Sequence, residues 1–238
     1  MTLDDQPPLF LNPEVLGITL LSFQVSCTAV FLAAIISIPI GTLLGLKDFR
    51  GKQLIITLTN TLMGLPPVVV GLLLYLLLSR SGPLGPLSLL YTPTAMILAQ
   101  FIMATPVIVG LTYSTISAVS QRIVEQTISL GATRRQLLLI MLKESKMGIL
   151  TSIIAAFGGA ISEVGAIMIV GGNIRYFTRT LTTAIVLYTS MGEFDIAITL
   201  GIILLTTSFI INLFLTYMQS KYKPEKGRKF NRGIRFGD

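Results

Sequence analysis

The chain has no histidine, no tryptophan and a single cysteine among its 238 residues. Without histidine it lacks the commonest general base and metal-binding side chain. One cysteine, Cys27, cannot form a disulfide or a thiolate metal site within one chain. There is also no Gly-rich phosphate-binding loop ending in Lys-Ser or Lys-Thr. These absences argue against an enzyme, so we expect no catalytic residue, no metal and no cofactor on this chain.

Charged residues are scarce as well. They make up 12% of the sequence, whereas hydrophobic residues make up 52%, which is too apolar for a soluble domain of this length. The first ten residues carry two acids and no lysine or arginine, so they do not resemble a secretory signal peptide. We therefore expect an all-α integral membrane protein, inserted by its own first span.

Hydropathy predicts about five membrane-spanning helices in one domain, residues 1–238, because about 20 mostly apolar residues cross the hydrocarbon layer as a helix. The predicted spans are Leu16–Leu46, Gln53–Leu78, Thr94–Ser117, Gly148–Gly172 and Ile196–Gln219. Pro39, Pro66-Pro67 and Pro106 are expected to kink or break their helices. The apolar stretch Leu181–Tyr188 is too short to cross, and we expect a re-entrant or interfacial helix there.

Basic residues are distributed unevenly between the two sides that these spans define. Of 18 lysines and arginines, all but Arg80, Arg175 and Arg179 lie on the side of residues 47–52, 121–146 and 220–238. The positive-inside rule places that side in the cytoplasm, with the N-terminus outside and the C-terminus inside. The basic tail, 220–238, is expected to be a topology anchor beside anionic lipid rather than a nucleic-acid-binding segment.

Residues 121–146 form an amphipathic, basic segment between very apolar ones. Apolar side chains recur at helical spacing before Gly131, which is typical of a helix C-terminus. Thr133 and Gln136 stand at the spacing of a capping box, which predicts a second short helix. Such a two-helix knob suits a groove on a soluble partner, although an amphipathic connector lying on the lipid surface has the same pattern.

The inner part of this segment resembles the cytoplasmic "EAA" loop of ABC importer permeases. Glu125 matches the glutamate of that pattern and Gly131 its glycine, while Gln126 and Thr127 replace the two alanines. Met141 stands where isoleucine is expected, and Lys143-Glu144 where Leu-Pro is expected. The resemblance implies that an ATPase subunit contacts this loop through Glu125, Gln126, Thr127, Gly131, Ala132 and Thr133.

A second resemblance narrows the family to molybdate and tungstate permeases. It rests on Ile161–Ala166, Gly171–Ile174 and Thr178–Ile185, and it is closest to tungstate permeases, as is Gly64–Leu72. It implies a type I ABC importer-like fold, a homodimer, two cytoplasmic subunits that bind ATP and Mg, and an extracytoplasmic oxyanion-binding protein. Molybdate or sulfate remain alternative substrates. A stand-alone channel or secondary carrier, or a structural anchor, remain alternative classes.

Few polar side chains are available for a path through the membrane. Asn60, Gln100, Thr105 and Asn173 are neutral candidates, and Glu163 is a carboxylate within a predicted span, where charge is costly. Because a carboxylate repels an anion, Glu163 suits a structural hydrogen-bonding role better than substrate binding, although a position near the gate is the alternative. Arg175 and Arg179, outside the spans, either attract an anion or partner, or are solvated loop charges.

Overall fold

The computed structural model describes residues 12–119 and 121–221, and all regular elements in these two ranges are helices. The basic tail predicted at 220–238 lies almost wholly outside the described residues. In chain order the elements are α1 (Pro13–Leu46), α2 (Lys52–Met63), α3 (Pro67–Leu78), the short 3-10 helix η3 (Gly85–Leu87), α4 (Pro93–Ser117), α5 (Gln121–Ser129), α6 (Arg134–Ile161), α7 (Gly165–Gly171), α8 (Leu181–Ser190) and α9 (Phe194–Lys221).

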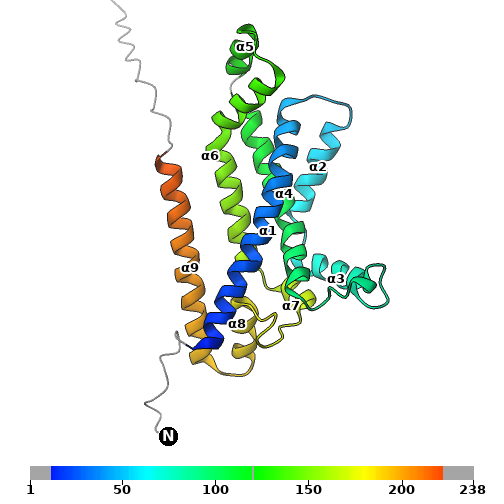
Figure 1. Ribbon diagram of the computed structural model, residues 1–238, viewed down its shortest axis with the longest axis vertical. Coiled ribbons are helices and arrows are strands. Elements are labelled where there is room, and N and C mark those ends of the chain that lie inside the picture. The colour runs from blue at the N-terminus through cyan, green and yellow to red at the C-terminus, as the bar shows by residue number, and fades with distance from the viewer. Residues whose placement is uncertain (1–11, 120, 222–238) are drawn as a thin grey trace, which may run out of the picture.

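The long helices run along one axis, with α1, α4 and α6 packed together and α9 beside them (Figure 1). The segments Pro13–Leu46, Pro93–Ser117 and Phe194–Phe214 are each long and apolar enough to cross a membrane, and two bent helix pairs bring the possible spans in the described chain to 5. The predicted all-helical membrane architecture is therefore confirmed. Pro39 and Pro106 lie inside helices that continue without a break.

Small buried side chains hold the three central helices together. Ala33 of α1, Ala104 of α4 and Ala156 and Ala160 of α6 are at most 4% exposed and belong to one apolar cluster. Such small side chains let helix backbones approach closely, which favours the van der Waals packing that contributes to helix association inside lipid.

The second predicted span is broken at Gly64-Leu65-Pro66. Here α2 and α3 meet at an angle of 98°, because Pro67 cannot donate a helical hydrogen bond and Pro66 disfavours helical geometry in the residue before it. As a result α3 extends sideways from the bundle (Figure 1). It packs on α7 at Gly71, where a side chain would begin 2.8 Å from Ala166 Cα.

The fourth predicted span is also bent, by 58°, between α6 and α7. Its start differs from the prediction, because α6 begins at Arg134 instead of near Gly148. The second half of the 121–146 segment is therefore not a separate short helix but the first turns of one continuous helix. Residues 134–147 contain neither proline nor glycine, so nothing in the backbone ends the helix at the membrane boundary.

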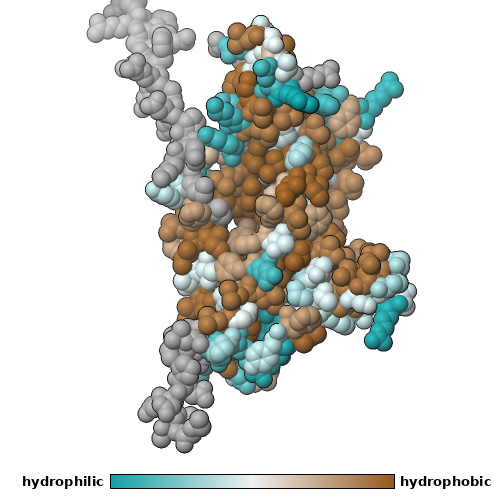
Figure 2. Space-filling view, in the orientation of Figure 1, coloured by the Kyte–Doolittle hydropathy of each residue, from teal (hydrophilic) through white to brown (hydrophobic). Residues whose placement is uncertain are grey.

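Apolar and charged side chains separate along the long axis. Apolar residues cover most of the middle of the face in Figure 2, and hydrophilic side chains gather mainly toward the two ends. One end carries α5, and the other carries α8, α7 and the start of α1 (Figure 1). We call these the α5 end and the α8 end. The short α8, at Leu181–Ser190, confirms the helix predicted at Leu181–Tyr188.

Candidate functional site

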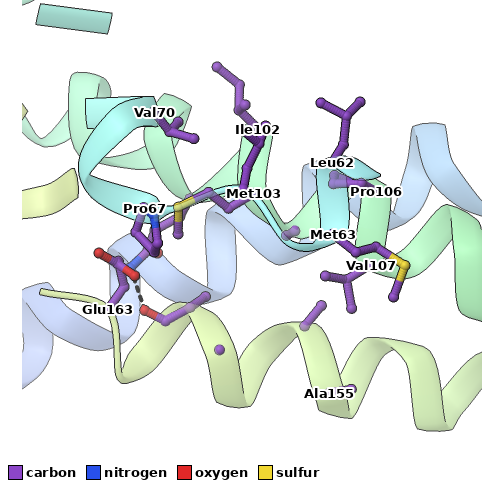
Figure 3. A pocket seen from close by; sticks show the side chains of 16 residues that line it. Leu62, Met63, Pro67, Val70, Ile102, Met103, Pro106, Val107, Ala155 and Glu163 are labelled. Carbon is purple, nitrogen blue, oxygen red and sulfur yellow. Dashed lines mark hydrogen bonds between the residues drawn. The ribbon is translucent and has the colours of Figure 1, made fainter. Parts of the chain in front are cut away.

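A cavity of about 230 Å³ lies where the two broken spans face the middle of α4 (Figure 3). Its walls come from the end of α2, the start of α3, the Gln100–Val107 stretch of α4 and the last two turns of α6. Most lining side chains are apolar, and the polar ones are Gln100 and Glu163. The sequence-predicted path residues Gln100 and Glu163 are thus brought together at one cavity, although they lie far apart in the chain.

Gln100 is enclosed, with 1% of its surface exposed. Its Nε2 donates a hydrogen bond of 2.6 Å to the Ala160 carbonyl, in the last turn of α6, which also accepts one of 3.3 Å from the Glu163 N–H. The Gln100 Oε1 has no hydrogen-bond partner in the described part of the chain. The side chain therefore stabilises the broken end of α6 and leaves one acceptor free beside the cavity.

Glu163 stands in the break itself and is 8% exposed. Its Oε1 accepts a hydrogen bond of 2.9 Å from the Ala166 N–H, and its carbonyl accepts one of 2.8 Å from the Thr182 hydroxyl. The first bond caps the start of α7, and the second ties the break to α8. This geometry gives Glu163 the hydrogen-bonding position that the sequence favoured, at the wall of the cavity.

The other three predicted path residues lie elsewhere. Asn60 is exposed on α2. The Thr105 hydroxyl donates to the Phe101 carbonyl at 2.7 Å, and the Thr105 carbonyl accepts from Ser37 of α1, so this residue belongs to the α1–α4 contact. Asn173 lies in the loop after α7 with φ +50° and donates to the Thr183 carbonyl at 3.4 Å.

Sequence reasoning missed most of the cavity wall. Ile102, Met103 and Val107 of α4 and Ala155 and Gly159 of α6 are ordinary membrane residues by composition. The sequence signal that could have located this cavity is the Gly64–Pro67 stretch. A span broken there needs another part of the protein to satisfy the main-chain groups at the break.

The second candidate site is α5 and the turn that follows it, at the extreme end of the molecule (Figure 1). Of the predicted coupling residues, Glu125, Gln126, Gly131 and Thr133 are exposed, Ala132 is half-buried and Thr127 is buried. The Thr127 hydroxyl donates within the helix to the Ile123 carbonyl at 2.7 Å. This end also presents two apolar side chains that are not among the predicted coupling residues, Leu130 at 88% exposure and Ile128 at 56%.

The turn between α5 and α6 has the predicted glycine conformation and the predicted capping hydrogen bonds. Gly131 adopts φ +76°, a left-handed conformation that favours glycine. Thr133 and Gln136 form the predicted capping box, with the Thr133 N–H donating to Gln136 Oε1 at 2.7 Å and the Gln136 N–H to Thr133 Oγ1 at 3.4 Å. The turn is therefore fixed by the Gly131 conformation and by its own capping side chains, while Glu125 and Gln126 of α5 stay exposed.

The sequence is similar to those of known membrane transport proteins. The family described as the binding-protein-dependent transport system inner membrane component matches residues 37–224. The tungstate uptake system permease protein of Peptoclostridium acidaminophilum is 44% identical over 88% of this chain and 92% of its own length. A probable anion ABC transporter permease protein of Haloferax volcanii is 42% identical over 90% of this chain and 94% of its own.

Solved structures share the fold at low sequence identity. The inward-facing methionine ABC transporter matches with a TM-score of 0.76 and 15% identity, over 92% of this chain and 100% of the matched chain. A bacterial alginate ABC transporter in complex with an alginate pentasaccharide-bound periplasmic protein matches with a TM-score of 0.75 and 18% identity, over 90% of this chain and 81% of that one. Both similarities bear on the fold alone.

The capping bond of Glu163 makes a direct prediction. Glu163→Ala removes the acceptor of the Ala166 N–H and should lower stability by about 1 kcal/mol, as loss of a helix cap does. Glu163→Gln keeps an Oε1 acceptor and should melt close to the unchanged protein. Thermal unfolding in detergent measures both, with Glu144→Ala, an exposed carboxylate on α6, as the control. Equal destabilisation by the alanine and glutamine variants would contradict the capping role.

Proposed function

The chain belongs to the family of binding-protein-dependent transport system inner membrane components, and from this premise we propose that it is the permease subunit of an ATP-driven tungstate importer. The observation that carries the substrate is the 44% identity to a tungstate uptake permease over 88% of this chain. Molybdate and sulfate are chemically close oxyanions and remain the alternatives within this class.

The proposed orientation puts the α5 end in the cytoplasm. Lys47, Arg50 and Lys52 lie in or beside the α1–α2 loop, and Arg135, Lys143 and Lys146 lie in the first turns of α6. The positive-inside rule favours this end for the cytoplasm. The start of α1 is then outside and the end of α9 inside, in the plasma membrane. The α8 end would meet the extracytoplasmic oxyanion-binding protein.

The cavity suits a passage better than a tight binding site. Glu163 is its one ionisable lining residue, and a carboxylate repels an oxyanion. We therefore assign selectivity to the external binding protein, and to this chain a weakly interacting path lined by apolar groups, amides and backbone. A second copy of the chain would complete that path. The exposed apolar residues of α3, including Val68, Leu72 and Leu76, offer a surface for it.

Coupling to ATP would use α5. Leu130 and Ile128 are exposed apolar side chains at the cytoplasmic end, beyond the long apolar helices, and this is the character of a helix that seats in a groove of another protein. The partner would be an ATPase subunit that binds ATP and Mg, with one copy for each permease chain. Because α6 is continuous for 28 residues, or about 40 Å at helical rise, it connects the α5 turn directly to the cavity. Movement of α5 would tilt α6 as a rigid body.

Uptake in cells that carry the complete system tests the substrate and the class together. Intracellular tungsten should rise above that of a strain lacking this chain, and equimolar molybdate or sulfate should compete weakly. Equal uptake of tungstate and molybdate would contradict the narrow substrate assignment. Uptake that persists after deletion of the ATPase subunit would contradict the importer class and favour a secondary carrier.

Proline substitutions at two comparable glycines test the proposed contact between α5 and the ATPase subunit. Gly131 and Gly192 both have positive φ, +76° and +80°, and both have open space around them. Proline fixes φ near −65°, so Gly131→Pro should distort the α5–α6 turn and reduce co-purification of the ATPase subunit about tenfold or more. Gly192→Pro, at the α8 end, is the matched control and should leave it unchanged. Equal co-purification with both variants would contradict the coupling role of α5.

A further inference from the structure

Glu163 carries a charge that its structural role does not require. Its Oε1 caps the start of α7 through the Ala166 N–H at 2.9 Å, but the neutral side chains of serine, threonine and asparagine cap helix starts about equally well. A carboxylate within a membrane span is costly, more so than a neutral side chain. The capping bond therefore explains why an acceptor stands at this position, and it leaves the negative charge unexplained.

No helix of the described chain brings a positive charge to this carboxylate. Glu163 makes no ion pair with any described residue. Helices α1, α3, α4, α7 and α8 contain no lysine or arginine, and the basic residues of α2, α6 and α9 lie toward the α5 end, the innermost being Lys52, Lys146 and Lys221. A second copy of the chain would bring the same helices, and therefore no counter-charge to the middle of the membrane.

The arginines at the α8 end do not supply the counter-charge either. Arg175 Nη2 donates to Glu14 Oε2 at 2.6 Å and Arg179 Nη1 donates to Glu14 Oε1 at 3.3 Å, so the carboxylate of Glu14 already pairs with both. Arg80 lies in the loop after α3 and lines a different cavity. Glu163 is thus 8% exposed, at the wall of a mostly apolar cavity, without a cationic partner in the described chain.

The other polar group of the cavity also offers an acceptor. Gln100 Nε2 donates to the Ala160 carbonyl, whereas Gln100 Oε1 has no hydrogen-bond partner in the described chain. The remaining lining residues are apolar, so little in the cavity screens a charge. The two polar side chains therefore place oxygen acceptors, and no cationic group, beside a space of about 230 Å³ (Figure 3).

We propose that the Glu163 carboxylate is an electrostatic barrier that keeps oxyanions out of this cavity while the path is closed. The proposal rests on the proposed function, because that function supplies the oxyanion and the path. Like charges repel far more strongly in an apolar cavity than in water, and a dianion doubles the effect of a single charge. The barrier stops substrate that has reached the cytoplasm from leaking back between transport cycles.

The place of Glu163 in the fold allows the barrier to be removed. Glu163 stands in the 58° bend between α6 and α7, and its carbonyl accepts a hydrogen bond of 2.8 Å from the Thr182 hydroxyl of α8. A side chain at Gly165 would begin 2.8 Å from Val68 Cγ2, at the start of α3. A change at either broken span therefore moves the carboxylate relative to α4. Tilting of α6 withdraws the charge in the same step that opens the path.

Efflux of tungstate from liposomes tests the barrier. The complete transporter, without binding protein or ATP, would be reconstituted in liposomes loaded with tungstate and with the neutral solute erythritol, and K⁺ with valinomycin would prevent a membrane potential. Glu163→Gln removes the charge and keeps the capping acceptor, so tungstate efflux should rise about tenfold or more while erythritol efflux stays within about twofold. Glu144→Gln, at an exposed carboxylate on α6, is the matched control and should leave both rates unchanged.

The two solutes separate the loss of charge from a loss of packing. Unchanged tungstate efflux in Glu163→Gln would overturn the proposal. An equal rise in tungstate and erythritol efflux would overturn it as well, because the variant would then have loosened the break. Parallel liposomes that enclose ATP, with the loaded binding protein outside, test the proposed function separately. Import of tungstate by the unchanged transporter would leave that function standing even if the barrier fails, and absence of import would count against the function itself.

Discussion

Main-chain groups inside a membrane must find their hydrogen-bond partners within the protein. Two spans of this chain are broken, between α2 and α3 and between α6 and α7, so main-chain groups at these breaks need partners other than those of a continuous helix. The structure meets this requirement with a few side chains at one place. Gln100 binds the Ala160 carbonyl at the end of α6, and Glu163 binds the Ala166 N–H at the start of α7. The other break, between α2 and α3, is formed by Pro66-Pro67. Because proline has no backbone N–H, fewer main-chain donors need a hydrogen-bond partner there. The cavity exists because these two breaks face each other across α4.

The helices that flank these breaks connect the cavity to the two ends of the molecule. Toward the α5 end, α6 runs unbroken from the Thr133–Gln136 capping box to Ile161. Toward the α8 end, α7 leads to Val170, whose carbonyl holds the Tyr91 loop. Between them, α3 packs on α7 at Gly71 with no room for a side chain. A displacement at either end therefore reaches the cavity through packed helices with few flexible joints. This arrangement fits rigid-body alternation between two packed states.

Much of this architecture could be predicted from the sequence, for identifiable reasons. Apolar runs located the spans, and Gly131 with Thr133 and Gln136 located the α5–α6 turn, because these signals are local. The continuous α6 was missed because hydropathy set the start of the fourth span at Gly148, although the backbone has no breaking residue at 134–147. Gln100 and Glu163 were chosen for polarity alone, and their meeting depends on the 58° and 98° bends. The bond between Glu14 and Arg175 joins residues 161 positions apart, which no local pattern reveals.

Cross-linking from single cysteines tests most directly whether the α5 end meets the ATPase while the α8 end meets the binding protein. Cys27 is the one cysteine of the chain, so Cys27→Ser provides a background without thiols. Leu130→Cys and Tyr176→Cys, both at highly exposed positions, would then be treated with a short bifunctional reagent in the complete transporter. We predict capture of the ATPase subunit from position 130 and of the binding protein from position 176. Capture of the ATPase subunit from position 176, or of the binding protein from position 130, would contradict the account.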